Sequence, residues 1–292
     1  MCRKQALAAT AVSALIAGLA FAGPASAWPF GGKKEKAEAA PAAAPVAPAS
    51  AQARPAPQKA PPALRAEARR MDPLAASAFW GREVEIDERD VEAGLGLSKA
   101  LRQLGRNQDA AAAAQRVLIV DPKNMDGLLE VSRAYIGMNQ GFYALEPLRR
   151  AIEIAPRDWR PVTLSAIAYE QAERDDEALA AHQRALALAP DEPTVLTNFA
   201  MYKAGQGDLP GAEQMLRRAI AHPRATPQMR QNLALVVGLQ GRVEEAERLA
   251  RQDLPPEMVQ ANMAWLRAAN ARPQPTAGNR SYQSVSQPGG TR

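Results

Sequence analysis

Two histidines, His182 and His222, are the side chains of this chain best suited to proton transfer near neutral pH. Catalysis or metal binding would require a partner group, and neither histidine has another histidine or a cysteine close to it in the sequence. His182 also occupies a repeated position that elsewhere holds alanine, leucine or tryptophan, which predicts that it packs in a core. We therefore expect no catalytic residue, no metal site and no cofactor, and the sequence predicts that the protein is not an enzyme.

Two other patterns resemble catalytic or ligand-binding motifs. Residues 94–99, Gly-Leu-Gly-Leu-Ser-Lys, resemble a phosphate-binding loop, but they lack the GxxxxGK(S/T) spacing and fall inside a predicted helix. Acidic pairs at residues 175–176 and 244–245 fall where helices are predicted to begin, and the helix dipole favours carboxylates there. Both patterns therefore predict local helix structure and not catalysis.

The elements that position these residues follow from a strict 34-residue period. Alanine recurs at this spacing as Ala76, Ala110, Ala144, Ala178, Ala212 and Ala246. Counted from Val91, the period gives five full units, 91–124, 125–158, 159–192, 193–226 and 227–260. A small residue at position 8, alanine at position 20 and, in three units, proline at position 32 resemble the tetratricopeptide repeat (TPR) signature, in which each unit is a pair of helices.

This resemblance implies an all-α fold, a TPR solenoid of about five helix pairs over residues 72–270. Position 15, at which the first helix of a unit should end, holds glycine or asparagine except at Glu173, and those residue types suit a left-handed cap. Residues 72–90 predict an N-terminal half repeat, and residues 258–270 predict a C-terminal capping helix. Pro147 lies several residues into a predicted helix, so we expect a kink or a late start there.

The two ends of the chain differ in composition from the repeats. Residues 1–27 combine two basic residues, an apolar stretch and an Ala-Ser-Ala site, which predicts a cleavable signal peptide, with an uncleaved membrane anchor as the alternative. Residues 28–71 are rich in alanine and proline and predict a disordered linker, and residues 271–292 predict a disordered tail. The single cysteine, Cys2, precedes the apolar stretch, so the sequence has no lipobox, and we expect a periplasmic protein.

Charge and surface pattern indicate protein partners. The formal net charge is +5, and basic residues form no stripe interleaved with aromatic residues, which argues against nucleic acid. In TPR domains positions 2, 5, 6, 9 and 12 of the first helix line a concave groove, so the resemblance implies a protein-binding groove here. Its candidate residues are Lys99, Arg102, Glu130, Arg133, Arg160, Thr163, Ile167, Asn198, Met201, Gln231 and Asn232. The first half of this set is charged and the second is nearly neutral and rich in amides, which suits an extended peptide or a partner helix.

A narrower resemblance covers residues 72–268. Residues 72–87, DPLAASAFWGREVEID, and residues 230–267, with an Asp-Leu-Pro-Pro turn at 253–256 and the run ANMAWL at 261–266, are similar to TadD-type proteins of the Flp (tight adherence, Tad) pilus assembly system. The resemblance implies a non-enzymatic assembly factor that helps to place the pilus secretion machinery at the outer membrane, with a secretin or other pilus-assembly components as partners. Because the sequence has no lipobox, we expect any association with the outer membrane to come through such partners. The alternative is a general cell-envelope scaffold or chaperone-like factor unrelated to pili.

Overall fold

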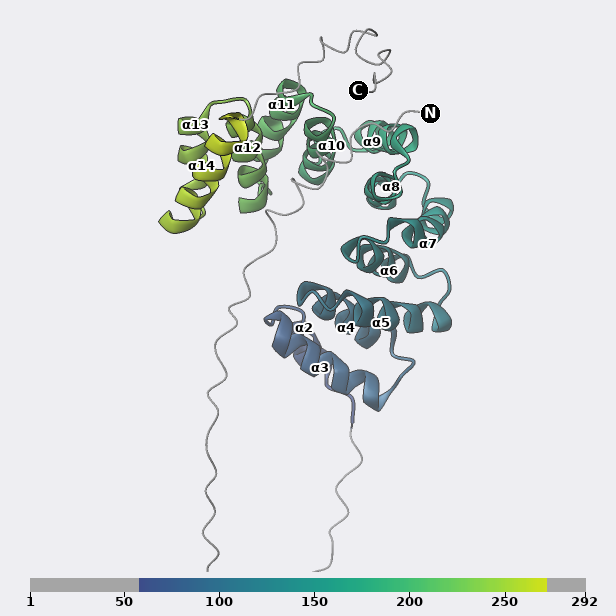
Figure 1. Cartoon of the computed structure of the whole chain (residues 1–292). Coiled ribbons are helices and arrows are strands. Elements are labelled where there is room, and N and C mark those ends of the chain that lie inside the picture. The colour runs from purple at the N-terminus through teal and green to yellow at the C-terminus, as the bar shows by residue number, and fades with distance from the viewer. Residues whose placement is uncertain (1–57, 272–292) are drawn as a thin grey trace, which may run out of the picture. The chain divides into compact units, whose positions relative to one another are not determined.

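The computed structural model describes residues 58–271, and within this range the chain is helical and has no strand. The helices are α2 (Pro62–Ala68), α3 (Pro73–Ile86), α4 (Val91–Gln103), α5 (Asn107–Val120), α6 (Met125–Gly137), α7 (Gly141–Ile154), α8 (Trp159–Gln171), α9 (Asp175–Leu188), α10 (Pro193–Gly205), α11 (Leu209–Ile220), α12 (Pro227–Leu239), α13 (Val243–Ala250) and α14 (Pro256–Ala271). Each helix packs against the next along the chain, from α2 to α14 (Figure 1). The predicted all-α solenoid is confirmed. We call α4, α6, α8, α10 and α12 the A helices, and α5, α7, α9, α11 and α13 the B helices.

The small-residue columns mark the places where an A helix crosses its B helix. The alanines of the 34-residue column are buried, and Ala110, Ala144, Ala178, Ala212 and Ala246 have no exposed surface. In the first unit the hydroxyl of Ser98 on α4 donates to the carbonyl oxygen of Ala110 on α5 at 2.8 Å. A larger side chain at either position would push the two helices apart, because the contact is already closely packed.

The A helices also begin in a repeated way, which the sequence analysis did not identify. The residue before each A helix is polar, and its side chain accepts a hydrogen bond from a backbone N–H in the first turn of that helix. These N-capping residues are Asp90, Asn124, Asp158, Glu192 and Thr226. The A helix therefore begins at the same position in every unit.

The A helices end in the left-handed conformation that position 15 was predicted to adopt. Gly105, Gly207 and Gly241 have φ values of 74°, 89° and 86°. Asn139 and Glu173 both have a φ of 56°, so Glu173 adopts the same conformation without being a residue type that favours it. The connection to the B helix is therefore the same in all five units, and at Glu173 it is strained.

Successive units are tied by an arginine that recurs with the period. The guanidinium groups of Arg184 and Arg218 donate to the carbonyl oxygens of Pro156 and Pro190, at 3.4 Å and 3.0 Å, and Arg150 donates in the same way to Pro122. Each bond joins a B helix to the closing proline of the preceding unit. The proline column therefore also supplies acceptors that hold neighbouring units together.

One expectation for α7 was partly wrong. The helix does not start late: it begins at Gly141, as the other B helices do, and continues through Pro147 to Ile154. Proline removes one backbone hydrogen bond from a helix, but Ala144, Leu148 and Ala151 are fully buried around it. The packing of this apolar face keeps the segment helical.

The two ends of the repeat stack are closed by short additions. At the C-terminus α14 packs on α12 and α13 and buries Val259, Met263 and Leu266, as a capping helix should. At the N-terminus α3 occupies the predicted half repeat, but it is preceded by α2, which lies inside the range 28–71 that composition predicted as linker. The predictions for residues 1–27, for most of the linker and for the tail fall outside the described residues.

Candidate functional site

His182 is a packed residue on α9, as predicted. Only 1% of its surface is exposed, and its ring stacks on Phe199 with ring centroids 5.1 Å apart and planes inclined by 6°. Its Nε2 atom lies 2.7 Å from a carboxylate oxygen of Glu170 on α8, a partner that the sequence analysis did not identify. The imidazole also contacts the ring of Tyr202, and its burial leaves almost no surface that a substrate could touch.

The glycine-rich segment and His222 also make structural contacts. Gly94 and Gly96 lie in α4, where an added Cβ would lie 2.5 Å from Val117 or from the ring of Trp80, so both glycines serve close helix packing. His222 accepts a hydrogen bond at Nδ1 from the backbone N–H of Arg224, 3.1 Å away. Among the described residues no three histidine, cysteine or acidic side chains are grouped to hold a metal ion.

The candidate binding residues lie on the A helices and meet across unit boundaries. Arg102 on α4 donates from Nε to Glu130 on α6 at 2.9 Å, and Arg133 donates to the same carboxylate at 2.8 Å. On the next helix Arg160 lies 3.7 Å from Asp126 and 2.6 Å from Asp158. These contacts show that positions 2, 6 and 12 of neighbouring A helices face one another, while position 9 contacts position 6 of the same helix. We call the surface that these positions form the A-helix face.

The pKa shifts of Asp158 and Arg160 show that these two charged groups stabilise each other. Burial raises the pKa of Asp158, but hydrogen bonds from Arg160 outweigh it and hold the pKa of this carboxyl below its usual value. Arg160 in turn has a raised pKa, chiefly because of its hydrogen bonds to Asp158. The carboxylate of Glu130 is buried between two guanidinium groups. In the first three units, therefore, most charged side chains of the A-helix face are ion-paired with one another or with a neighbouring residue.

The same positions in the last two units carry no charge. Position 9 changes from arginine or lysine to apolar residues, in the order Arg65, Lys99, Arg133, Ile167, Met201 and Leu235. Position 6 holds Asn198 and Asn232 in the last two units, and both are half-buried. Among the described residues Asn198 makes no side-chain hydrogen bond, and Asn232 makes one, from Gln228 at 3.2 Å. The ion pair that Arg230 of α12 makes with Asp253 borders this face, because Gln231 also donates to Asp253, at 3.4 Å.

The structure sorts the predicted binding residues by exposure. Lys99 is exposed, whereas Glu130 and Thr163 are buried, with 7% and 2% of their surfaces exposed. The hydroxyl of Thr163 has no hydrogen-bond partner within the described residues and is covered by its neighbours. The remaining predicted residues are half-buried: Arg102, Arg133, Arg160, Ile167, Asn198, Met201, Gln231 and Asn232. A ligand of this face would therefore contact that half-buried set, together with Lys99.

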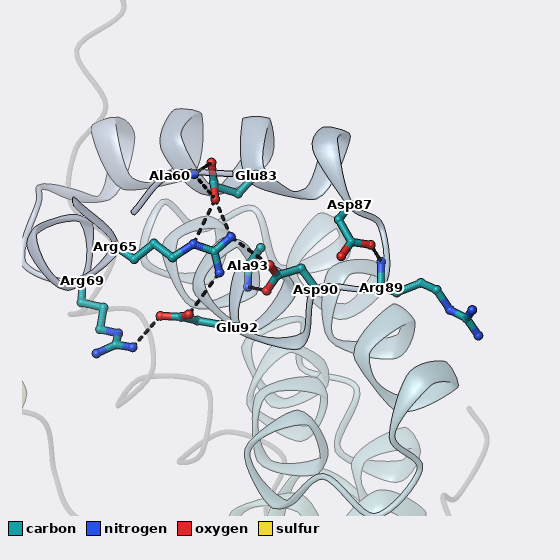
Figure 2. Close-up of polar contacts among 9 residues, drawn as sticks. All are labelled: Ala60, Arg65, Arg69, Glu83, Asp87, Arg89, Asp90, Glu92 and Ala93. Atoms are coloured by element: carbon teal, nitrogen blue, oxygen red, sulfur yellow. Dashed lines mark hydrogen bonds and ion pairs between the residues drawn. The ribbon is translucent and has the colours of Figure 1, made fainter. Parts of the chain in front are cut away.

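Arg65 on α2 is the most highly connected charged residue that the sequence analysis did not identify (Figure 2). Its guanidinium donates to Glu83 on α3, to Asp90 at 2.8 Å and to Glu92 on α4 at 3.1 Å. The hydrogen bond to Asp90 is the main reason that the pKa of Arg65 is raised. Glu83 also accepts hydrogen bonds from the backbone N–H of Ala60.

The position of Arg65 relates α2 to the repeats. Arg65 precedes Lys99 by one full period, so in sequence α2 corresponds to the second half of the first helix of a preceding unit. Apart from Arg65 it buries only Ala68, and a buried charge with several partners replaces most of the usual apolar packing. The signal in the sequence was the period itself, continued backwards into the alanine- and proline-rich segment.

Between residues 58 and 271, none of the helices combines the length and the apolar character that crossing a membrane would require. The family model of the tetratricopeptide repeat matches residues 163–196. No curated protein sequence matches the chain.

Two solved structures support the fold. A thermophilic TPR protein of Thermus thermophilus is 20% identical, with a TM-score of 0.54, over 59% of this chain and 98% of that one. A tetratricopeptide repeat protein of Parabacteroides merdae is 13% identical, with a TM-score of 0.60, over 70% of this chain and 85% of that one. With the helix pairs and their 34-residue period, these likenesses identify the described part of the chain as a TPR solenoid.

Proposed function

We propose that this chain is a non-enzymatic adaptor that binds protein partners on the A-helix face, in the periplasm, during assembly of the Flp (Tad) pilus. The observation that carries the adaptor role is the A-helix face itself. Five stacked units place equivalent side chains on a shared surface, and neighbouring A helices contact one another along it. Repeat proteins use such extended surfaces to bind other proteins.

Support for the pilus pathway comes from the two segments that resemble TadD-type proteins. Residues 72–87 comprise α3 and its two capping residues, and residues 230–267 run from α12 through α13 into α14, so these segments lie at both ends of the repeat stack. Support for the periplasm comes from the signal-peptide pattern of residues 1–27. A secretin or another component of the pilus machinery is the partner class that this proposal implies, and association with the outer membrane would follow from such a partner.

The proposal can be tested by chemical crosslinking in intact cells, followed by purification of the full chain and identification of the captured proteins by mass spectrometry. A variant with Arg133→Glu and Met201→Glu alters the A-helix face in both halves. The matched control is Ile119→Glu on α5, where the side chain is already 79% exposed. Circular dichroism verifies that both variants fold.

We expect the wild type and the Ile119→Glu control to capture pilus-assembly components and the double variant to lose them. If the captured proteins depend on the A-helix face but belong to other envelope systems, the general-scaffold alternative replaces the pilus assignment. If no captured protein distinguishes the double variant from the control, the A-helix face is not the binding surface and the adaptor proposal is wrong.

A further inference from the structure

The A-helix face has two electrostatically different halves. We define the paired half by Lys99, Arg102, Glu130, Arg133 and Arg160, and the neutral half by Ile167, Asn198, Met201, Asn232 and Leu235. In the paired half most charged groups already have a partner on the same or the next A helix. In the neutral half no ion pair joins one A helix to the next within the described residues.

We infer that the neutral half carries the recognition site and that its ligand is an uncharged polypeptide segment in an extended conformation. This inference rests on the proposed function, because it names the partner chemistry of the same surface. It extends that function by assigning binding to one half of the surface and by predicting which residues a ligand can carry.

Apart from the exposed Lys99, the paired half is a poor place for a ligand. A ligand carboxylate there would compete with Glu130 for Arg102 and Arg133, whose side chains already bond to it at 2.9 Å and 2.8 Å. Displacing Glu130 would leave a carboxylate buried without its partners, which is unfavourable. The paired half therefore joins α4, α6 and α8 to one another.

The neutral half offers unused hydrogen-bonding groups next to apolar surface. Asn198 has no side-chain partner within the described residues, and the side-chain amide of Asn232 accepts from Gln228 but donates to no group there. A side-chain amide both donates and accepts, as a peptide group does. Beside these amides, half-buried Met201 and Leu235 pack against the apolar core and leave part of their surface open.

These groups favour an extended segment over a helix. A helix has already paired most of its backbone N–H and C=O groups, so it has few to offer to asparagine side chains. An extended segment exposes its backbone and can place apolar side chains on Ile167, Met201 and Leu235. A charged side chain would find no ion-pairing partner among the five residues of the neutral half and would lose hydration, so the segment should be uncharged where it touches them.

The test uses the full chain and a phage library of random linear peptides as the probe. Enriched peptides are synthesised, and their binding is measured by fluorescence anisotropy. The test variant is Asn198→Asp with Asn232→Asp, which keeps side-chain size but adds charge. The matched control changes the paired half by Lys99→Gln, and melting curves verify that all variants fold.

We expect enriched peptides to share an uncharged, partly apolar core. Their affinity should fall about tenfold or more in the double variant, because each new carboxylate is desolvated without a partner. It should change less than about twofold in the control and little between low and high salt, since screening acts on charges.

A charged shared motif, or a loss of affinity that follows Lys99→Gln, would overturn the inference and leave the adaptor role standing. If no peptide is enriched, a linear segment is not the ligand and the inference also fails. In that case the adaptor role is decided separately by the crosslinking experiment described above.

Discussion

Glu173 shows how the repeat overrides the preference of a single residue. Its φ of 56° lies in the left-handed region, which disfavours L-residues with a side chain, and its own side chain is exposed. The residue is held there because the cap joins α8 to α9, and both helices are fixed by burial of Ala166, Ala168 and Ala178. The strain is local, so a change of residue should release it without altering the helices.

Glu173→Gly should therefore stabilise the protein, by about 0.5–1 kcal/mol, because glycine adopts this conformation without steric cost but gains more freedom in the unfolded chain. Urea unfolding followed by circular dichroism measures the difference. Asn139→Gly is the matched control, since Asn139 has the same φ of 56° but tolerates it better, and its gain should be smaller. Destabilisation by Glu173→Gly would show that the glutamate side chain contributes a contact that outweighs the strain.

Helices α7 and α8 approach each other closely at Gly141, which lies at the start of α7. A Cβ added to Gly141 would lie 2.5 Å from the carbonyl oxygen of Ala168 and 3.0 Å from its Cα, both backbone atoms of α8. Gly205 at the end of α10 is the opposite case, because nothing lies within 4 Å of its added Cβ.

Gly141→Ala should lower the free energy of unfolding by about 1–3 kcal/mol, because α7 and α8 must move apart to admit the methyl group. Gly205→Ala, as the control, should leave stability unchanged or raise it by up to about 1 kcal/mol. Thermal and urea unfolding of the full chain measure both. Equal effects of the two substitutions would contradict the close approach of α7 and α8.

The capping helix depends partly on an ion pair. Asp253 precedes α14 and accepts hydrogen bonds from Arg230 on α12, and these bonds lower the pKa of Asp253 more than burial raises it. A carboxyl whose pKa is lower in the folded state stabilises that state above its unfolded pKa of about 3.9 and loses this contribution as the pH falls through the folded value.

Asp253→Asn should therefore reduce the protection of α14 against hydrogen exchange at neutral pH, and the difference from wild type should shrink as the pH drops below about 4. Hydrogen exchange at matched pH, read by mass spectrometry on α14 peptides, measures the difference. A difference that stays constant from neutral pH to pH of about 2.5 would show that the Asp253 carboxylate does not act through its charge.

At the scale of the whole molecule, the sequence predicted the repeat frame better than it predicted the surface. Ala110 and Ser98 could be placed at a helix crossing because only small residues fit there, and the period repeats that constraint. The pairing of Arg102 with Glu130 could not be predicted, because it joins residues of two units whose side-chain directions depend on the stacking of α4 and α6. Thr163 was predicted to face a ligand but is buried, because its side-chain direction also depends on how the units stack.

Helix α2 was missed for a different reason. Composition describes a segment on average, and the alanine- and proline-rich segment before Asp72 predicted a linker as a whole. One arginine inside it, Arg65, reaches Glu83, Asp90 and Glu92 and holds the last part of that segment on α3 and α4. A single buried charge with several partners can thus order a segment whose average composition favours disorder.

Site-specific photocrosslinking in living cells can show whether partners bind the A-helix face. A photoreactive benzoylphenylalanine would replace Asn198 on α10 in one strain and the highly exposed Ile119 on α5 in another. If partners bind this face, position 198 should give a discrete crosslinked protein, and position 119 should not crosslink to that protein. Crosslinks to the same protein from both positions, or from position 119 alone, would contradict it.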